Sequence, residues 1–239
     1  MLKSNKKENR MSEFLYEKEM NEIFIKLSNN LPKFWDGKKC IEYMKKNNCK
    51  NWRQMEWIGF YFQFMCEKIL TQGDFMQIPG VKYGNVEFDG FKAIPWDFKA
   101  HSINKNKLDN GKIPTNGCNE SNQAINEFGT IGFIIISGES DYDDDKQTFK
   151  KWHDLYKGGT SNYEKERIKR NAPSRKRKIN FTPQKLFFVF VEKDNVQSCG
   201  KFQANFRNAD GSARNPKLML DLKNNNSLKI KCFNFDNNI

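Results

Sequence analysis

Thr130-Ile-Gly-Phe-Ile-Ile-Ile-Ser137 is the segment that decides the fold of this chain. Its eight residues carry no charge and are rich in β-branched side chains, which predicts a strand buried on both faces. A similar apolar run, Leu186–Val191, lies within a second expected strand, Lys185–Glu192. Such strands need a helix or another sheet over each face, so these two runs indicate a layered domain.

Helical patterns precede these strands and lie between them. The clearest is Asn51–Leu70, with Asn51 as its expected N-cap and a stripe of apolar residues at helical spacing: Trp52, Met55, Gly59, Phe62, Cys66 and Ile69. We expect further helices over Ser12–Leu27, Asp36–Asn47, Glu120–Phe128 and Gln147–Tyr156. Shorter strands are expected over Gly84–Ile94 and Trp96–Ser102, and a polar loop over Asn104–Gly117.

This order predicts a single α/β (α+β) domain over residues 1–239, with a mixed central sheet flanked by helices. Residues 1–12 read as a solvated basic tail, and residues 196–239 as short strands and loops. The 21 phenylalanines supply core material, and the mean hydropathy of -0.84 comes from abundant Lys and Asn. The chain therefore differs from disordered sequences, which have few aromatic residues.

The chain is strongly basic, with 41 Lys and Arg against 29 Asp and Glu, a formal net charge of +12. Such a balance favours a polyanionic partner, either nucleic acid or an anionic membrane surface. The alternative is a surface enriched in lysine without a specific partner. The first residues lack an apolar signal region, no apolar run approaches ~18 residues, and the six cysteines form no CxxC pair. We expect a cytoplasmic protein with reduced cysteines, no membrane segment and no structural zinc.

The residues expected to carry chemistry are Asp89, Asp97 and Lys99. Alternate side chains of a strand share a face, so Asp97 and Lys99 point away from the core that Phe98 enters. Asp89 ends the preceding strand, where its carboxylate can meet that of Asp97. Two adjacent carboxylates favour a hard cation such as Mg²⁺, and a neighbouring lysine can position water near a phosphate. His101 shares their face and is a possible phosphate contact.

Asp89, seven intervening residues and then Asp97-Phe98-Lys99 resemble the bipartite signature of the PD-(D/E)xK nuclease superfamily. The resemblance covers about residues 50–195 and implies an αβββαβ core in which Asp89 and Asp97 bind Mg²⁺ and Lys99 assists the attacking water. Phe88 stands where the signature has proline. Members of the superfamily also place a glutamate on the helix before the first of these strands, and Glu56 fits that place.

Asp221-Leu222-Lys223 is a competing triplet, with Asp210 upstream. It is followed by only sixteen residues, whereas Asp97 and Lys99 have a helix upstream and a helix and strand downstream, as the superfamily core requires. The position in the chain therefore favours Asp97 and Lys99.

Two segments are expected to contact DNA. A basic run would bind phosphates through Lys165, Arg167, Lys169, Arg170, Arg175, Lys176, Arg177 and Lys178. A polar C-terminal segment carries side chains suited to base edges: Arg207, Asn208, Arg214 and Asn215. For each segment the alternative is an ordinary solvated loop.

Within the superfamily, a chain of this size resembles a type II restriction endonuclease, which cuts double-stranded DNA. The resemblance implies a homodimer, with a cognate DNA methyltransferase as its functional partner. Two alternatives remain, a repair nuclease of the same superfamily and a nucleic-acid-binding protein without catalysis. Closely spaced histidines for an HNH nuclease and a GxxxxGK[ST] motif for a P-loop ATPase are both missing from the sequence.

Overall fold

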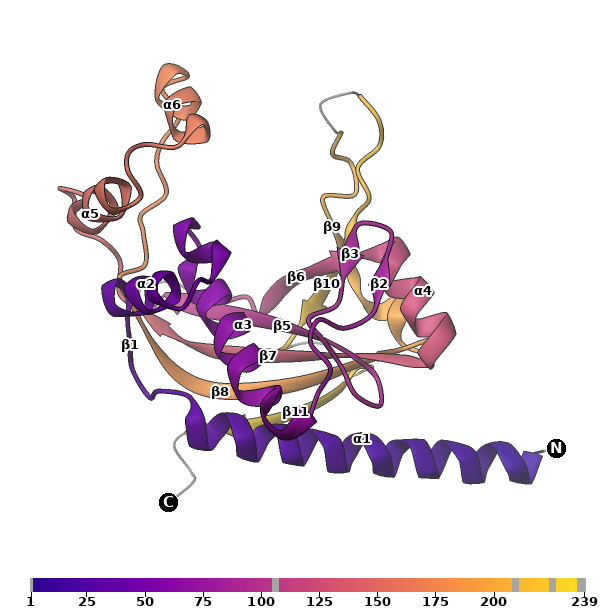
Figure 1. Cartoon of the computed structure of the whole chain (residues 1–239). Helices are drawn as coiled ribbons and strands as arrows, with labels where there is room; N and C mark the ends of the chain where they lie inside the picture. The colour runs from indigo at the N-terminus through magenta and orange to yellow at the C-terminus, as the bar shows by residue number, and fades with distance from the viewer. Residues whose placement is uncertain (1, 105–107, 208–210, 224–226, 236–239) are drawn as a thin grey trace.

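The computed structural model describes residues 2–104, 108–207, 211–223 and 227–235, without the side chains of residues 2–15 and 163. Its centre is a mixed sheet in the order β1-β8-β7-β5-β4, with β11 also pairing with β8 (Figure 1). The strands are β1 (Trp35–Asp36), β4 (Gly90–Phe91), β5 (Pro95–Asn104), β7 (Thr130–Ser140), β8 (Asn180–Glu192) and β11 (Lys229–Asn234). In this sheet β5 and β7 are parallel, and the other pairs are antiparallel.

Helices and two small sheets surround this centre. The α-helices are α1 (Leu2–Asn30), α2 (Gly37–Lys46), α3 (Trp57–Leu70), α4 (Cys118–Phe128), α5 (Thr148–Tyr156) and α6 (Asn162–Lys169). Short 3₁₀ helices are η1 (Lys50–Arg53), η2 (Gln72–Asp74) and η3 (Val196–Ser198). One small sheet has the order β6 (Lys112–Gly117), β10 (Lys217–Asp221), β9 (Gly200–Phe202), and the other pairs β2 (Lys82–Tyr83) with β3 (Val86–Glu87).

Strand β7 is buried on both faces, as its sequence predicts. On one face Ile134 and Ile136 join a core that includes Phe62 of α3 and the buried residues of α1 and α2. On the opposite face Phe133 and Ile135 join a second core with α4 and the β6-β10-β9 sheet. The result is three layers: helices α1 to α3, the central sheet, and α4 with the small sheet.

The connection from β5 to β7 runs through β6 and α4. A connection between parallel strands must cross one face of the sheet, which accounts for the position of α4 in the second core. Parallel strands end at the same edge, and the register pairs Asn104 of β5 with Ser140 of β7. Both strands therefore finish at one end of the sheet.

Residues 141–179, called the arm below, join β7 to β8 and contain α5 and α6 (Figure 1). Their two ends meet at a neck: the N–H of Ile179 donates to the carbonyl of Asp141, and the N–H of Asp143 donates to the carbonyl of Arg177, at 2.9 and 2.8 Å. Figure 1 shows the arm and the loop between β9 and β10 projecting from the body on the side away from α1.

Three expected boundaries are wrong. The tail predicted for residues 1–12 is helical from Leu2, in a segment free of Pro and Gly. The helix predicted from Asn51 begins at Trp57, after η1, and Asn51 lies within η1 instead of capping α3. Residues 112–117, predicted as loop, form β6, because Ile113 and Thr115 are buried alternately against β10.

Among the described residues, no helix combines the length and the apolar character that crossing a lipid bilayer requires.

The longest helix, α1, runs along the β11 side of the sheet and extends past it at its N-terminal end (Figure 1). It is fixed by Glu19, which is 3% exposed and accepts hydrogen bonds from the Trp96 indole, at 2.8 Å, and from the N–H of Ala93, at 3.2 Å.

We predict opposite effects for two glycine-to-alanine substitutions. A Cβ at Gly132 in β7 would overlap the ring of Trp96, which is fully buried, so Gly132→Ala should destabilise the protein by about 1–3 kcal/mol. A Cβ at Gly59 in α3 would meet no atom within 4 Å, so Gly59→Ala should stabilise by about 0.5–1 kcal/mol. Urea unfolding of both variants measures the difference, and equal effects would contradict this packing.

Candidate active site

Asp89 joins three elements at one edge of the central sheet. It lies between β3 and β4, and its Oδ2 accepts a 2.6 Å hydrogen bond from the backbone N–H of Phe98 in β5. Its Oδ1 accepts a 2.7 Å hydrogen bond from Nε2 of Gln63 in α3. The carboxylate is therefore fixed between a strand backbone and a helix.

Asp97 and Lys99 lie side by side on β5. Phe98 and Ala100 pack into the core under α3, so Asp97 and Lys99 take the other face, which is the alternation expected from the strand. Asp97 is 2% exposed, and its Oδ2 forms an ion pair with Nζ of Lys99. The Lys99 side chain is 26% exposed, so the lysine end of this ion pair reaches solvent while the carboxylate end is buried.

The surroundings of Asp89 raise the pKa of its carboxyl group. Burial raises the pKa of Asp89 well above its usual value, and the nearby charge of Asp97 raises it further, against the opposing effect of Lys99. Asp97 contributes to this raised pKa both through its charge and as a hydrogen-bonding neighbour. Burial would lower the pKa of Lys99, but Asp97 and Asp89 raise it above its usual value.

Gln63 is the residue of α3 that reaches this pair, and the sequence analysis did not assign it. Its amide also hydrogen-bonds Glu67, one turn later, and burial raises the pKa of that glutamate. The adjacent Cys66 is buried, and burial first, then Asp89 and Glu67, raise the pKa of its thiol well above the usual value. A thiolate nucleophile is therefore disfavoured at this site.

Glu56 does not occupy the expected place beside the buried stripe. Because α3 begins at Trp57, Glu56 precedes the helix, and its side chain is 55% exposed and pairs with Lys178 at 3.3 Å. Gln63 lies two helical turns further along. The sequence signal for Gln63 was its position one heptad after Glu56. Because the predicted start of the helix was too early, the role was assigned to Glu56 instead.

His101 and the competing triplet are engaged elsewhere. His101 Nε2 lies 2.9 Å from Oδ1 of Asp109, and Nζ of Lys223 lies 3.3 Å from Oδ2 of the same aspartate. Asp221 accepts the backbone N–H of Lys223. The ammonium of the Asp221-Leu222-Lys223 triplet thus pairs with Asp109, whereas that of Lys99 pairs with the aspartate of its own triplet. Asp210 lies outside the described residues.

The basic run is spread over α6 and the segment leading to β8, and four of its eight cations form ion pairs with acidic side chains. The ion pairs are Arg167 with Glu164, Lys169 with Glu166, Lys176 with Asp145 and Lys178 with Glu56. Arg170 donates to the carbonyl of Glu166, and Lys165 and Arg175 are exposed. Arg177 differs from all of these because it is 8% exposed.

The proposed base-reading residues lie at the β9–β10 loop. Arg207 and Arg214 are exposed there, and Arg207 bridges to Ala213 across the loop. Asn215 instead donates to Glu120 of α4 at 2.6 Å, which turns its amide toward the body. Asn208 lies outside the described residues.

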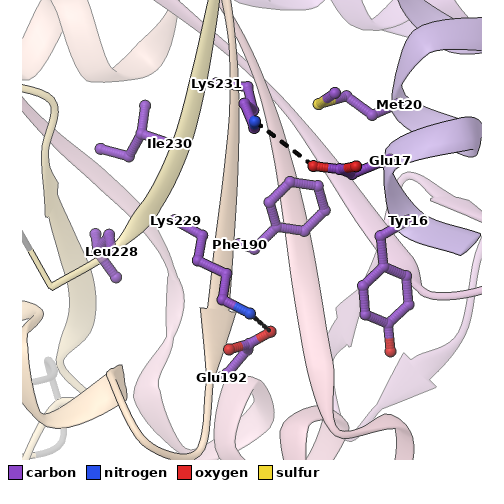
Figure 2. A pocket seen from close by; sticks show the side chains of 9 residues that line it. All are labelled: Tyr16, Glu17, Met20, Phe190, Glu192, Leu228, Lys229, Ile230 and Lys231. Carbon is purple, nitrogen blue, oxygen red and sulfur yellow. Dashed lines mark hydrogen bonds and ion pairs between the residues drawn. The ribbon is translucent and has the colours of Figure 1, made fainter. Parts of the chain in front are cut away.

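A pocket of about 340 Å³ lies between α1 and β11, away from these groups. Figure 2 shows Lys231 paired with Glu17 and Lys229 paired with Glu192 around it, beside the ring of Phe190. Its charged groups neutralise one another, and none of its lining residues belongs to the Asp89–Asp97–Lys99 group. It offers no catalytic set.

No protein-family model, curated protein or solved structure matched this chain, so its chemistry is argued from the site itself. The described residues contain no group of three or more His, Cys, Asp or Glu side chains arranged to hold a metal. What the site offers is a pair of carboxyl groups, one of them almost fully buried, with a lysine beside them. This set suits a hard divalent cation that completes its shell with water or substrate oxygens.

We predict that Asp89→Asn stabilises the metal-free protein. Because the folded pKa of Asp89 is raised, the folded state holds more protons than the unfolded state, and stability falls as pH rises above about 4. Asparagine cannot ionise, and its amide can still meet Gln63 and the Phe98 N–H. Urea unfolding at pH 7 should therefore show a higher free energy of unfolding for Asp89→Asn than for the wild type.

Asp194→Asn is the control for this prediction, because Asp194 is exposed and is not part of the site. Its unfolding free energy should follow the wild type across the same pH range. A loss of stability in Asp89→Asn would show that the carboxylate is not strained in the metal-free protein.

Proposed function

We propose that this protein is a Mg²⁺-dependent endodeoxyribonuclease of the PD-(D/E)xK type, acting as a type II restriction enzyme on double-stranded DNA. The observation that carries the proposal is the convergence of Asp89 and Asp97 with Lys99 against the latter aspartate. Bringing two acids together in a mostly buried place costs free energy, because like charges repel and lose their hydration there. A fold without a functional need for this arrangement would avoid it.

The residues present fit a bound Mg²⁺. Asp89 and Asp97 would hold the ion, because a divalent cation would offset the repulsion between the two carboxylates. When bound, Mg²⁺ would polarise the phosphate and lower the pKa of a coordinated water. Gln63 would fix the orientation of Asp89 through the 2.7 Å hydrogen bond from α3.

Lys99 would act on the phosphate and the attacking water. Its ammonium is protonated in the metal-free site, because the two aspartates raise its pKa. A cation bound to the same carboxylates would weaken that ion pair, which frees the lysine to contact water or the negative charge developing on phosphate. Its partly exposed side chain, at 26%, gives this end of the site access to solvent.

The order of elements supports the family assignment beyond the triplet. Helix α3 precedes Asp89, β5 carries Asp97 and Lys99, and α4 leads to β7, which is parallel to β5. The proposed αβββαβ core requires this helix before the first acid and this crossover after the lysine. The net charge of +12 supports a DNA substrate. A homodimer and a cognate methyltransferase remain part of the proposal through the family resemblance.

We predict that Asp97→Asn and Lys99→Ala abolish cutting but retain DNA binding, because they remove a metal ligand and the phosphate-facing cation. Digestion of unmethylated plasmid and phage DNA, with Mg²⁺ or with EDTA, should give discrete fragments with 5′-phosphates only for the wild type with Mg²⁺. Mobility shifts in EDTA measure binding.

Asp221→Asn and Glu56→Gln are the matched controls for these variants and should cut at the wild-type rate. A smear would indicate a nuclease without sequence specificity. Uncut DNA that is shifted by every variant would favour the binding protein without catalysis, and normal cutting by Asp97→Asn would rule out this site.

A separate prediction concerns the metal itself. Millimolar Mg²⁺ should raise the melting temperature of the wild type and of Asp194→Asn, but not that of Asp89→Asn, because binding to the folded state alone stabilises it. The shift should grow as the pH rises above the usual carboxyl range, because the raised pKa of Asp89 makes the cation compete with a proton. Differential scanning fluorimetry measures it, and equal shifts in all three proteins would place the cation elsewhere.

A further inference from the structure

Three aromatic side chains from two distant segments pack together beside α2. Trp52 of η1 meets Tyr156 of α5 edge to face, with ring centroids 5.4 Å apart, and Tyr156 stacks on Trp152 at 5.3 Å. All three side chains are half-buried and pack against the core under the helices. They form an aromatic surface at the base of the arm, where α5 lies beside α2 (Figure 1).

This aromatic surface is fixed to the body from below. Phe149 of α5 is 5% exposed, and its ring lies 5.5 Å from that of Trp152. His153 is 2% exposed, and its Nε2 donates a 3.2 Å hydrogen bond to the carbonyl of Trp52, which ties η1 to α5. Burial lowers the pKa of His153 to about 4, so the imidazole is neutral at pH 7 and adds no charge.

Three cations lie over these rings. Their charged groups and the ring centres are separated by 4.0 Å for Lys45 and Tyr156, 4.7 Å for Lys45 and Trp52, 5.4 Å for Lys38 and Trp152, and 5.1 Å for Arg53 and Trp52. All three cationic side chains are exposed. An aromatic face attracts a cation but carries no net charge, so the rings orient these three charges without neutralising them.

The acids around these cations do not neutralise them either. None of the three forms an ion pair with a side chain that the structure describes. Asp154 of α5 pairs instead with Lys150 at 3.2 Å and with Lys157 at 2.8 Å. Glu42 is exposed on α2, between Lys38 and Lys45 in sequence, and pairs with neither. The basic run of α6 differs, because four of its cations are held by acidic side chains.

We propose that this group, called the ring cluster, binds the phosphate backbone of duplex DNA. It consists of Lys38, Lys45, Arg53, Trp52, Trp152 and Tyr156. Each cation that meets a phosphate releases counterions from the DNA. Because the rings already hold the cations in place, less side-chain entropy is lost on binding. The choice of DNA as the partner rests on the proposed function.

The arrangement of the rings favours phosphate contacts over base stacking. Single-stranded nucleic acids bind by stacking bases on open aromatic faces. Here Trp152 and Tyr156 stack on each other, and each ring of the cluster also has a cation over it. The cluster shares no residue with the Asp89–Asp97–Lys99 group, so DNA binding at the cluster and cutting at the candidate active site can be tested separately.

The test uses the full chain and three variants, in EDTA so that no DNA is cut. The first combines Lys38→Gln with Lys45→Gln and removes two cations of the cluster. Its matched control combines Lys18→Gln with Lys193→Gln, because these lysines are also exposed but lie on α1 and just after β8. Both double variants change the net charge equally. The third variant, Glu42→Gln, removes the acid beside the cluster.

The affinity for a fluorescent duplex of about 20 base pairs is measured by anisotropy at several salt concentrations. We expect the cluster variant to lower the slope of log affinity against log salt by about two, and the affinity at about 0.1 M salt by roughly tenfold or more. The control variant should stay close to the wild type. Glu42→Gln should bind more tightly than the wild type, a gain that misfolding cannot produce.

Iodide quenching of tryptophan fluorescence gives a second, local measurement. Of the five tryptophans, Trp35, Trp57 and Trp96 are at most 1% exposed, so the emission that iodide reaches comes from Trp52 and Trp152 of the cluster. Iodide and chloride are exchanged at constant ionic strength. Saturating duplex should protect the wild type and the control variant from quenching, because the DNA covers these two rings.

The proposal is overturned if the cluster variant binds the duplex like the control variant and the duplex leaves quenching of the wild type unchanged. It is also overturned if the wild type binds RNA or phosphatidylserine vesicles but no duplex. A digestion with Mg²⁺ separates this proposal from the proposed function. A wild type that binds and is protected but never cuts would retain the ring cluster and refute the nuclease. A wild type that cuts, with a cluster variant that binds and cuts equally well, would refute the ring cluster alone.

Discussion

The burial of β7 on both faces is the constraint on which the rest of this structure depends. Ile134 and Ile136 need one covering layer, and Phe133 and Ile135 need another, so the sheet has to be enclosed between α1 to α3 and α4 with its small sheet. The parallel partner β5 lies one strand nearer the edge, beside the two-residue strand β4. Asp97 and Lys99 lie on this strand, directly after the buried Trp96.

The candidate site illustrates a conflict between stability and chemistry. Asp89 and Asp97 are held together by backbone and amide hydrogen bonds that originate in the fold, and not by attraction between the two groups. The raised pKa of Asp89 is the measure of that conflict. A protein whose only requirement was stability would place a neutral side chain there. The nuclease proposal rests on this pair, because a ligand that prefers two carboxylates would relieve the repulsion between them.

The sequence predicts those features that depend on local periodicity. The alternation of Asp97, Phe98 and Lys99, the helix α4 and the burial of β7 all follow from spacing within one segment. It does not predict contacts set by distant pairing. Strand β6 forms by pairing with β10, about a hundred residues later in the chain. Its Pro and Gly residues are typical of loops, so the sequence alone predicts a loop there. Gln63 was missed for the same reason: only the packing of α3 against β5 brings its amide to Asp89.

The neck of the arm has a further consequence. Residues 141 and 179 face each other across two antiparallel strands that are already paired, so the chain between them leaves and re-enters the sheet at adjacent points. The arm is nevertheless not separable from the interior, because Phe149 of α5 lies in the core beneath α1 to α3 and Trp152 and Tyr156 pack against it. Any change in the length of the arm must therefore preserve the face of α5 that closes this core.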